Sequence, residues 1–552
     1  MSTSFLRRFL KRLLARDRVE AARGLLPGPL SRPPEEAAQA LMAGTLHIPG
    51  FDTKKAPGGK IDWSGSDEPP RAYLRQLHGH AMLRDFAHAH RRTGQRDLLD
   101  FAVGIVRDWL QRNPREQPAN RMAWHDEATA MRVQSWLLLR EELLAVGHGA
   151  AKQITHALND HAALLASEEF HTTGTNHGMF QDESLLTYAS LVPEDPLSSS
   201  YFELATSRLD AYFDLIVTSD GVHREHAPSY HNLIAGKIKR MATFYEEAGE
   251  DETAQQLQTL QRSMSRYATH VIKPDASFPL VSDTFERVRP KPDLFDDDEY
   301  LWAASRGQDG VPPRERQVVF PDGGYAIFRN RWSADGNATY IHFTAAYHTD
   351  YHKHSDDLSV WLYHNGDLLT EAGPNGYDYD NPFTAYGYSA HAHNTLLVDG
   401  ESLPRVDDQS DEVHLVAWDV DGPEPWATGR NARFDDLVHE RTVRFDPEAL
   451  HLEVHDLIEG VSAHRYTLLW NCAPGVEPHI SEGTVILQRD GEKAATITLE
   501  SPEPVKLNRV YGDIDARRGF RLGGGDPTPT WVVEIEVESV DELSLTHTIA
   551  LQ

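Results

Sequence analysis

The sequence is poor in cysteine, in basic residues and in long apolar runs. Cys472 is the one cysteine among 552 residues, which excludes an internal disulfide. No apolar run is long enough to cross a bilayer as a helix. Lysine and arginine number 54 against 84 aspartates and glutamates, which gives a formal net charge of −30. A protein this acidic repels polyanions at long range, so the composition argues against a nucleic-acid partner.

Several familiar motifs are also missing. We find no glycine-rich nucleotide-binding motif, no zinc-finger spacing and no serine nucleophile elbow. The first 26 residues place apolar side chains at helical spacing between arginines and lysines, without the unbroken apolar core or the cleavage site of a secretory signal. We therefore predict an arm over residues 1–70 that begins with an amphipathic helix. We predict a cytoplasmic protein, with the periplasm or secretion as the alternative.

The first half of the chain has the apolar spacing of helices. Short polar breaks separate the periodic segments, and short breaks favour antiparallel neighbours. We therefore predict a helical domain over residues 71–300, built from repeated helical hairpins. A generic helical bundle would give the same pattern. The predicted helices lie at 80–92, 97–113, 129–146, 150–167, 199–218, 230–248 and 253–270.

The second half alternates short apolar runs with turns rich in Asp, Gly and Asn. This pattern is typical of a sandwich of antiparallel sheets, which we predict over residues 315–552. The boundary is expected in the charged, proline-rich segment 287–316, where Asp296 to Glu299 read as a solvated linker. The fold class is therefore multidomain α+β. Predicted strands include 340–344, 359–363, 451–457, 484–487, 494–499 and 531–537.

Histidines, carboxylates and tyrosines are most densely packed between Tyr347 and Gly400. In a strand, His352 and His354 would project from the same face, because alternate side chains share a face. Glu371 and His393 lie on what read as the next strands, and two histidines with one carboxylate are a common zinc set. The alternative is a polar sheet face whose histidines are simply hydrogen-bonded or exposed.

Two segments of the helical half also carry chemistry. In the first, Asn176 and His177 lie where Thr175 or Asn176 could cap a helix, and a helix N-terminus also welcomes an anion. In the second, Tyr230 begins a helix close to Arg224, Glu225 and several histidines. The plainer interpretation gives the first pair a capping role and makes Tyr230 a packing residue with a wet hydroxyl.

A further patch joins Trp124 to Arg132. The indole of Trp124 could stack on a sugar ring, and Arg132 could bind a substrate carboxylate through two parallel hydrogen bonds. A buried tryptophan beside a surface ion pair explains the same residues equally well.

The order of these motifs resembles the heparinase II/III-like polysaccharide lyases. The matching residues are HKHSD at 352–356, EAG at 371–373 with Tyr377, and AHNT at 392–395 followed by VDG at 398–400. In the helical half, the Asn-His pair and the DGVHREHAPSYH segment at 220–231 match in the expected order. The resemblance implies an N-terminal incomplete (α/α) toroid followed by a C-terminal antiparallel β-sandwich.

The resemblance also implies roles for individual residues. Asn176 and His177 would neutralise a substrate carboxylate, while Tyr230 and His352 would exchange protons with the substrate. Tyr377 is a further catalytic candidate, with Tyr386 or Tyr388 as rivals. Arg224 and Glu225 would join Trp124 and Arg132 in binding substrate. His354, Glu371 and His393 would hold a structural zinc or another divalent metal; Glu371 stands where the family more often has Asp.

The expected reaction is β-elimination in an acidic, uronate-containing polysaccharide. Glycosaminoglycan-like chains such as heparan sulfate, hyaluronan or chondroitin are the first expectation, and alginate or a bacterial exopolysaccharide the second. A hydrolase would need paired carboxylates, for which Asp220 with Glu225, or Asp126 with Glu127, could be proposed. A non-catalytic protein of surface-polysaccharide synthesis is the rival from another class. The sequence leaves room for a homo-oligomer.

Overall fold

The computed structural model describes residues 17–552, apart from the side chains at 59, 539 and 540. The predicted N-terminal amphipathic helix lies largely outside the described residues, of which 17–23 are helical. The chain forms two compact units. The first comprises residues 1–216 and 240–255, and the second comprises 217–239 and 256–552. The three domains predicted from the sequence stay a prediction.

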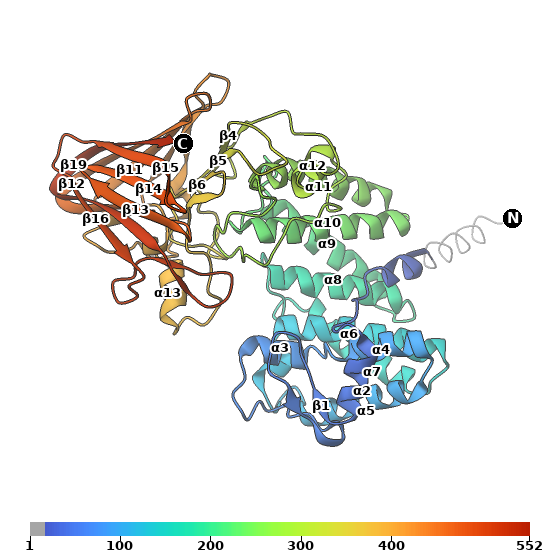
Figure 1. The fold of residues 1–552 in the computed structure, drawn as a ribbon. Helices are drawn as coiled ribbons and strands as arrows, with labels where there is room; N and C mark the ends of the chain where they lie inside the picture. Colours follow the sequence, from blue (N-terminus) through green and yellow to red (C-terminus); the bar gives the residue numbers. More distant parts are fainter. Residues whose placement is uncertain (1–16) are drawn as a thin grey trace. The chain divides into compact units, whose positions relative to one another are not determined.

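The first unit is helical, as its periodicity predicts, and appears in blue to green in Figure 1. Helices pack with the next helix in the chain, as α8 does with α9, and with the next but one, as α4 does with α6 and α6 with α8. The helices are α2 (Pro34–Met42), α3 (Arg71–His78), α4 (Leu83–Thr93), α5 (Arg96–Arg112), α6 (Asp126–Ala145), α7 (Ala151–Ala166), α8 (Asn176–Leu191) and α9 (Ser198–Ile216).

Three more helices complete the helical half: α10 (Pro228–Glu247), α11 (Asp251–Val271) and α12 (Asp298–Ala304). The last corrects the sequence analysis, which treated Asp296 to Glu299 as linker. The Asp297 side chain accepts hydrogen bonds from the backbone N–H groups of Glu299 and Tyr300, and so caps α12. Tyr300 is fully buried, which anchors the helix.

Two antiparallel sheets form the framework of the second unit and lie in the yellow to red part of the chain in Figure 1. The five-stranded sheet runs β3-β4-β5-β6-β7, and the central path of the larger, ten-stranded sheet runs β13-β14-β15-β19-β12-β11-β10-β9. In chain order the first strands are β3 (Gln317–Phe320), β4 (Tyr325–Arg329), β5 (Thr339–Thr344), β6 (Val360–His364), β7 (Asp367–Leu369) and β8 (Leu396–Val398). A short helix, α13 (Pro382–Tyr388), lies between β7 and β8.

The larger sheet is built around two long strands, β12 (His451–Asn471) and β19 (Trp531–Leu551), which pair antiparallel along most of their length. Besides these two strands and β8, the larger sheet contains β9 (Val413–Asp419), β10 (Trp426–Asn431), β11 (Leu437–Asp446), β13 (Val476–Ser481), β14 (Thr484–Arg489), β15 (Glu492–Glu500) and β16 (Lys506–Tyr511). Two further pairs of two-residue strands form separate small sheets: β1 (Thr45–Leu46) with β2 (Lys54–Lys55), and β17 (Phe520–Arg521) with β18 (Thr528–Pro529).

One apolar core joins the two sheets. Phe328 and Phe343 of the smaller sheet belong to the same buried cluster as Leu452 and Val533 of the larger one. Residues of β11 alternate strictly between buried and half-buried positions, because its side chains point in turn to the core and to the surface. The sandwich predicted from the alternating pattern is therefore present. Among the described residues, no helix is both long enough and apolar enough to cross a membrane.

The beginning of α8 depends on a close backbone contact at Gly178. A Cβ added there would overlap the carbonyl oxygen of Thr172. Thr175 caps this helix by accepting a hydrogen bond from the Gly178 N–H at 3.1 Å, which is one of the two caps expected from the sequence. The glycine therefore lets the loop before α8 fold back against the helix that begins with Asn176.

We predict that Gly178→Ala lowers the free energy of unfolding by about 1–3 kcal/mol, the usual cost of forcing extra atoms into a packed site. The matched control is Gly104→Ala in α5, where a Cβ meets nothing within 4 Å. Because alanine is the better helix former, this control should be stabilising by about 0.5–1 kcal/mol. Urea unfolding followed by circular dichroism measures the free energy of unfolding of both variants. If the two substitutions change it by the same amount in the same direction, the packing argument is wrong.

Candidate active site

The segment with His352 and His354 is a loop between β5 and β6, not a strand. His352 has a backbone φ of 56°, in the left-handed region that β strands do not use. The expectation that strand alternation brings the two imidazoles to one face is therefore wrong. Glu371 and His393 also lie outside the strands, after β7 and before β8 respectively. All four residues therefore lie on loops. A buried carboxylate holds His352 and His354 in place.

That carboxylate belongs to Asp283, which lies outside every motif named above. His352 donates from Nδ1 to one oxygen of Asp283 at 2.7 Å, and His354 donates from Nε2 to the other at 3.0 Å. The Asp283 side chain is 1% exposed. Burial by itself opposes ionisation, but the hydrogen bonds from His352 and His354 outweigh it, so the pKa of Asp283 lies below its usual value.

Two tyrosines meet at His352. The ring of Tyr230 stacks on the imidazole with 3.7 Å between centroids, and its hydroxyl lies 3.2 Å from the hydroxyl of Tyr377. Burial of the hydroxyl end and the negative charge of Asp283 raise the pKa of Tyr377 above its usual value. The structure thus brings together three of the predicted catalytic residues, Tyr230, His352 and Tyr377.

The rival tyrosines have other contacts. The Tyr386 hydroxyl accepts a hydrogen bond from the backbone N–H of Phe520 at 3.3 Å and is buried. Tyr388 donates to Asp283 at 3.3 Å, and its ring packs edge-on against His354. Tyr377 is therefore the one of the three whose hydroxyl reaches Tyr230.

Arg224 and Glu225, predicted to bind substrate, are placed differently from each other. Glu225 is fully buried, with a carboxylate oxygen 3.4 Å from Nε2 of His352. It is therefore placed beneath the imidazole and not at a surface that a polysaccharide could reach. Arg224 is half-buried.

A cavity of about 470 Å³ opens over this group. His352, Tyr377 and Asp283 line it together with Asp350, Tyr351, Tyr379 and Arg405. Arg405 is the one arginine or lysine among the described residues that line the cavity. Its guanidinium lies 4.8 Å from the centre of the Tyr388 ring and donates to the carbonyl of Lys353 at 3.2 Å. The cavity therefore offers an anion one fixed cation beside tyrosine hydroxyls.

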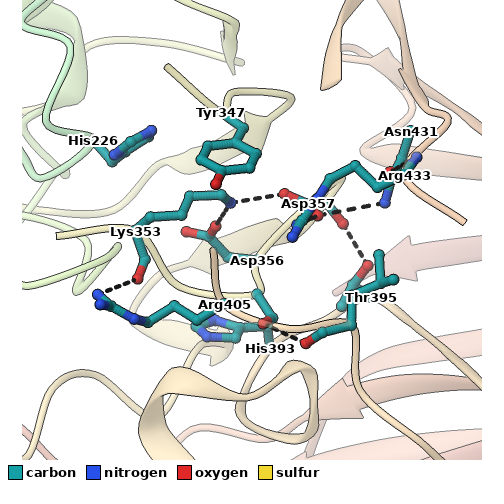
Figure 2. A network of polar contacts seen from close by, with 12 residues as sticks. His226, Tyr347, Lys353, Asp356, Asp357, His393, Thr395, Arg405, Asn431 and Arg433 are labelled. Carbon is teal, nitrogen blue, oxygen red and sulfur yellow. Dashed lines mark hydrogen bonds and ion pairs between the residues drawn. The ribbon is translucent and has the colours of Figure 1, made fainter. Parts of the chain in front are cut away.

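A buried ion network holds the loop in place (Figure 2). The Lys353 ammonium group, which is completely buried, donates to Asp356 at 2.5 Å and to Asp357 at 2.7 Å. Arg433 donates to the other oxygen of Asp357 at 2.5 Å and to Asp407 at 2.7 Å. These carboxylates raise the pKa of Lys353 in spite of its burial. The network fixes the backbone on both sides of His354.

The AHNT motif pins the neighbouring strands. The Asn394 amide donates to the carbonyls of Val360 and Thr370, at 2.8 and 3.2 Å, and its oxygen accepts from the backbone N–H of Asn471 at 2.6 Å. Thr395 donates its hydroxyl to the carbonyl of Asp357 at 2.5 Å. One buried side chain thereby joins β6, β12 and the segment after β7, which explains why this short motif lies beside the site.

The predicted zinc residues offer the types of ligand atom that zinc binds, imidazole nitrogen and carboxylate oxygen. Nδ1 of His354, both nitrogens of His393 and one oxygen of Glu371 are buried without a hydrogen-bond partner among the described residues. His393 Nδ1 and Glu371 Oε2 lie 2.9 Å apart without the angles of a hydrogen bond, and the rings of His354 and His393 are 5.4 Å apart. Orphaned imidazole and carboxylate atoms of this kind are what a cation would satisfy.

A tighter set of ligand atoms lies in the first unit. Within the described residues, the set whose donor atoms all lie within 4.8 Å of one another is His125, Asp126 and His177. These residues could hold a metal. They are also hydrogen-bonded among themselves, because His177 donates to Asp126 at 3.2 Å and Thr172 donates to it at 2.9 Å.

Asn176 and His177 begin α8. The hydrogen bond to Asp126 raises the pKa of His177, and the same contacts lower the pKa of Asp126 although burial opposes this. Asn176 is half-buried in the first turn, where the helix N–H groups are free. These two residues belong to the first unit, whereas Tyr230, His352 and Tyr377 belong to the second, so the two groups are described separately.

Arg132 does not fit the role predicted for it. Its side chain is completely buried, where it donates to His161, to the carbonyl of His78 and to Thr129. The guanidinium lies 4.1 Å from the centre of the Trp109 ring. Trp124 is half-buried and donates its indole N–H to the carbonyl of Asn113. The plainer alternative, a core position, therefore describes Arg132 correctly.

A helical half followed by a two-sheet sandwich, with histidines and tyrosines on loops, defines a protein of the toroid-and-sandwich class. A family model for the heparinase II/III N-terminus matches residues 18–291, and a model for the heparinase II/III-like C-terminal region matches residues 312–546. Together they take in most of the chain. The chain belongs to the heparinase II/III-like family.

Individual relatives agree with this family. The heparin-sulfate lyase of Bacteroides thetaiotaomicron is 22% identical over 430 residues, which cover 70% of this chain and 59% of the relative. A crystal structure of heparinase III matches with a TM-score of 0.79 at 17% identity, over 96% of this chain and 86% of that one. The heparan sulfate lyase from Pedobacter heparinus matches with a TM-score of 0.70 at 17% identity, over 98% and 88%. The predicted toroid and sandwich are thereby confirmed.

Sequence reasoning missed three residues that the structure brings to the site: Asp283, Arg405 and, beside His177, His125. Asp283 and Arg405 lie far along the chain from the histidines and carry no motif around them. The adjacent pair His125 and Asp126 was visible as part of a charged patch, but nothing in its spacing pointed to His177.

We predict that Lys353→Met lowers the free energy of unfolding by about 3–5 kcal/mol, because it leaves Asp356 and Asp357 as buried charges short of a partner. The matched control is Lys506→Met, which removes an exposed ion pair with Glu536 and should change nothing measurable. Denaturant unfolding of both variants tests this. Similar small effects in both would show that the network contributes little to stability.

Proposed function

We propose that the protein is a polysaccharide lyase that cleaves uronate-containing chains by β-elimination. The observation that carries this proposal is the 3.2 Å approach of the Tyr230 and Tyr377 hydroxyls beside His352, where His352 and Tyr377 line a cavity that holds one arginine. Family membership supports the same chemistry. The name of the Bacteroides relative, a heparin-sulfate lyase, favours a glycosaminoglycan as the substrate.

In this reaction the bond between C5 of the uronate and its hydrogen breaks, and its electron pair forms the C4=C5 double bond. The bond from C4 to the bridging oxygen breaks at the same time, and that oxygen takes up a proton. The site must therefore supply a base at C5, an acid at the leaving oxygen and a partner for the uronate carboxylate, on which negative charge develops.

The second unit offers the acid and the base. The Tyr377 hydroxyl faces the cavity and lies 3.2 Å from the Tyr230 hydroxyl, which places it as the donor of a proton to the leaving oxygen. Tyr230 and His352 are stacked and form the group that removes the C5 proton. Nδ1 of His352 donates to Asp283, so we assign proton exchange to Nε2, which lies 3.4 Å from the buried Glu225 carboxylate.

The first unit carries a separate group of residues for which we propose a role in binding a carboxylate. Asn176 lies in the first turn of α8, where an amide donor and free backbone N–H groups favour an anion. His177 has a raised pKa and so carries positive charge over a wider pH range than a free histidine. Neutralising the carboxylate would make the C5 proton more acidic.

Arg405 gives the cavity its anion contact. A guanidinium binds a carboxylate or a sulfate through two parallel hydrogen bonds, and stacking near Tyr388 holds this one in place. This supports an acidic polysaccharide as the substrate. Alginate and bacterial exopolysaccharides remain the second choice of substrate.

We further propose that His354, Glu371 and His393 hold a structural zinc ion. When bound, the metal would cross-link the loops after β5 and β7 with the segment before β8. The buried, unpartnered atoms of these residues support this proposal. His125, Asp126 and His177 form a second candidate metal site, and the elemental analysis described below distinguishes the two.

The first test is incubation with heparan sulfate, hyaluronan, chondroitin, alginate and polyglucuronate while ultraviolet absorbance is followed. A rise shows the new C4=C5 double bond and gives the substrate class. New reducing ends without that absorbance would replace elimination by hydrolysis. Binding of these chains without either signal would favour the non-catalytic alternative.

We predict that Tyr230→Phe lowers kcat about 10²–10⁴-fold, the usual contribution of a proton-transfer group, with KM little changed. The ring still stacks on His352, so only the hydroxyl is lost. Tyr511→Phe, at an exposed tyrosine of β16, is the control and should match wild type. Turnover of Tyr230→Phe equal to wild type would remove this hydroxyl from the mechanism.

Elemental analysis tests the metal. We predict about one zinc per chain in protein purified with zinc present, lost in His354→Ala and kept in His125→Ala. The opposite pattern would assign the metal to the His125 set. A metal-free wild type would contradict the zinc proposal altogether.

A further inference from the structure

Asp283 occupies an unusual position. It follows α11 in a segment without regular secondary structure, and the preceding residue, Ser282, has a left-handed φ of 50°. A non-glycine residue in this region costs roughly 1 kcal/mol or more, so its conformation persists only where contacts hold it. His352, on the other side of the contact, is also left-handed. Two strained backbones therefore meet at one buried carboxylate.

The carboxylate divides its two oxygens between two histidines. Oδ2 accepts from Nδ1 of His352 at 2.7 Å, which leaves Nε2 of that ring for chemistry beside Glu225. Oδ1 accepts from Nε2 of His354 at 3.0 Å, which leaves Nδ1 of that ring without a partner among the described residues. The two imidazoles are thus held through opposite nitrogens.

We propose that Asp283 is a positioning residue that orients both histidines at once. It selects Nε2 of His352 for proton exchange with the substrate, and it selects Nδ1 of His354 for the metal. This inference rests on the proposed function for its first half and on the proposed zinc site for its second. It makes one carboxylate the physical link between the reacting group and the metal-binding group.

The surroundings require an acceptor at this position. His352, His354 and the Tyr388 hydroxyl all direct donors at Asp283, the last at 3.3 Å. A carboxylate has only acceptor oxygens, whereas an amide of the same shape turns an NH₂ group toward one of these donors. An asparagine would therefore turn one imidazole to its other tautomer or break a contact. The shape would be kept and the orientation lost.

The test compares wild type with Asp283→Asn and Asp283→Glu. We expect Asp283→Asn to lower kcat about 10²–10⁴-fold with KM little changed, the loss expected for a proton-transfer group facing the wrong way. We expect its zinc affinity, measured by competition with a chelating dye, to fall about 10–100-fold, as is usual when the partner of a metal-binding histidine is lost. Asp283→Glu keeps the acceptor and should recover part of both.

Glu286→Gln is the matched control, because it makes the same carboxylate-to-amide change at an exposed position of the same segment. It should leave kcat and zinc affinity as in wild type. Circular dichroism and thermal unfolding confirm that each variant is folded. If Asp283→Asn does not fold, the comparison of Asp283→Glu with wild type decides. A change in zinc affinity with full kcat, or a change in kcat with full zinc affinity, would overturn the shared role.

The outcomes separate this inference from the proposed function. An inactive wild type that binds zinc would refute the lyase proposal, and the zinc affinity of Asp283→Asn would still decide the His354 half. An active wild type with an equally active Asp283→Asn would overturn the His352 half. A loss of kcat without any change in zinc affinity would show that Asp283 acts on one histidine only.

Discussion

Burial of charge in the loop between β5 and β6 is the constraint on which the site depends. Lys353 has no exposed surface, so its ammonium group is stable there only while Asp356 and Asp357 surround it. Asp357 in turn needs Arg433, which reaches it from the larger sheet. Because these contacts cannot be changed singly, the loop has one conformation, and His352 and His354 take their places from it.

Of the proposed reacting groups, His352 and Tyr377 are carried by loops, and Tyr230 lies near the start of α10. The two-sheet core fixes the ends of β6 and β12, and Asn394 ties them to the segment that leads to Glu371. Loops on such a support can hold residues in backbone conformations that a strand forbids, as His352 shows with its left-handed φ. Rigidity comes from the sheets, and the chemical variety comes from what the loops present.

An acidic protein for an acidic substrate requires local positive charge. The net charge of −30 acts over the whole surface, but salt screens it within about 10 Å, so a few placed cations decide the potential inside a cavity. Arg405 supplies such a cation in the cavity of the second unit. The negative surface charge therefore acts at long range and the local positive charge acts within the cavity, so an acidic protein can still bind an acidic substrate.

Periodicity along the sequence determined the helices, the sandwich and the motifs, because apolar spacing depends only on neighbours along the chain. The order of the motifs, through its resemblance to the lyase family, placed Tyr230, His352 and Tyr377 among the catalytic candidates. Tertiary structure alone decided that the His352 segment is a loop, that Arg132 is buried under Trp109, and that Asp283 joins the histidines. Contacts between residues distant in sequence leave no local pattern, and burial of a charge depends on partners that only the folded chain brings together.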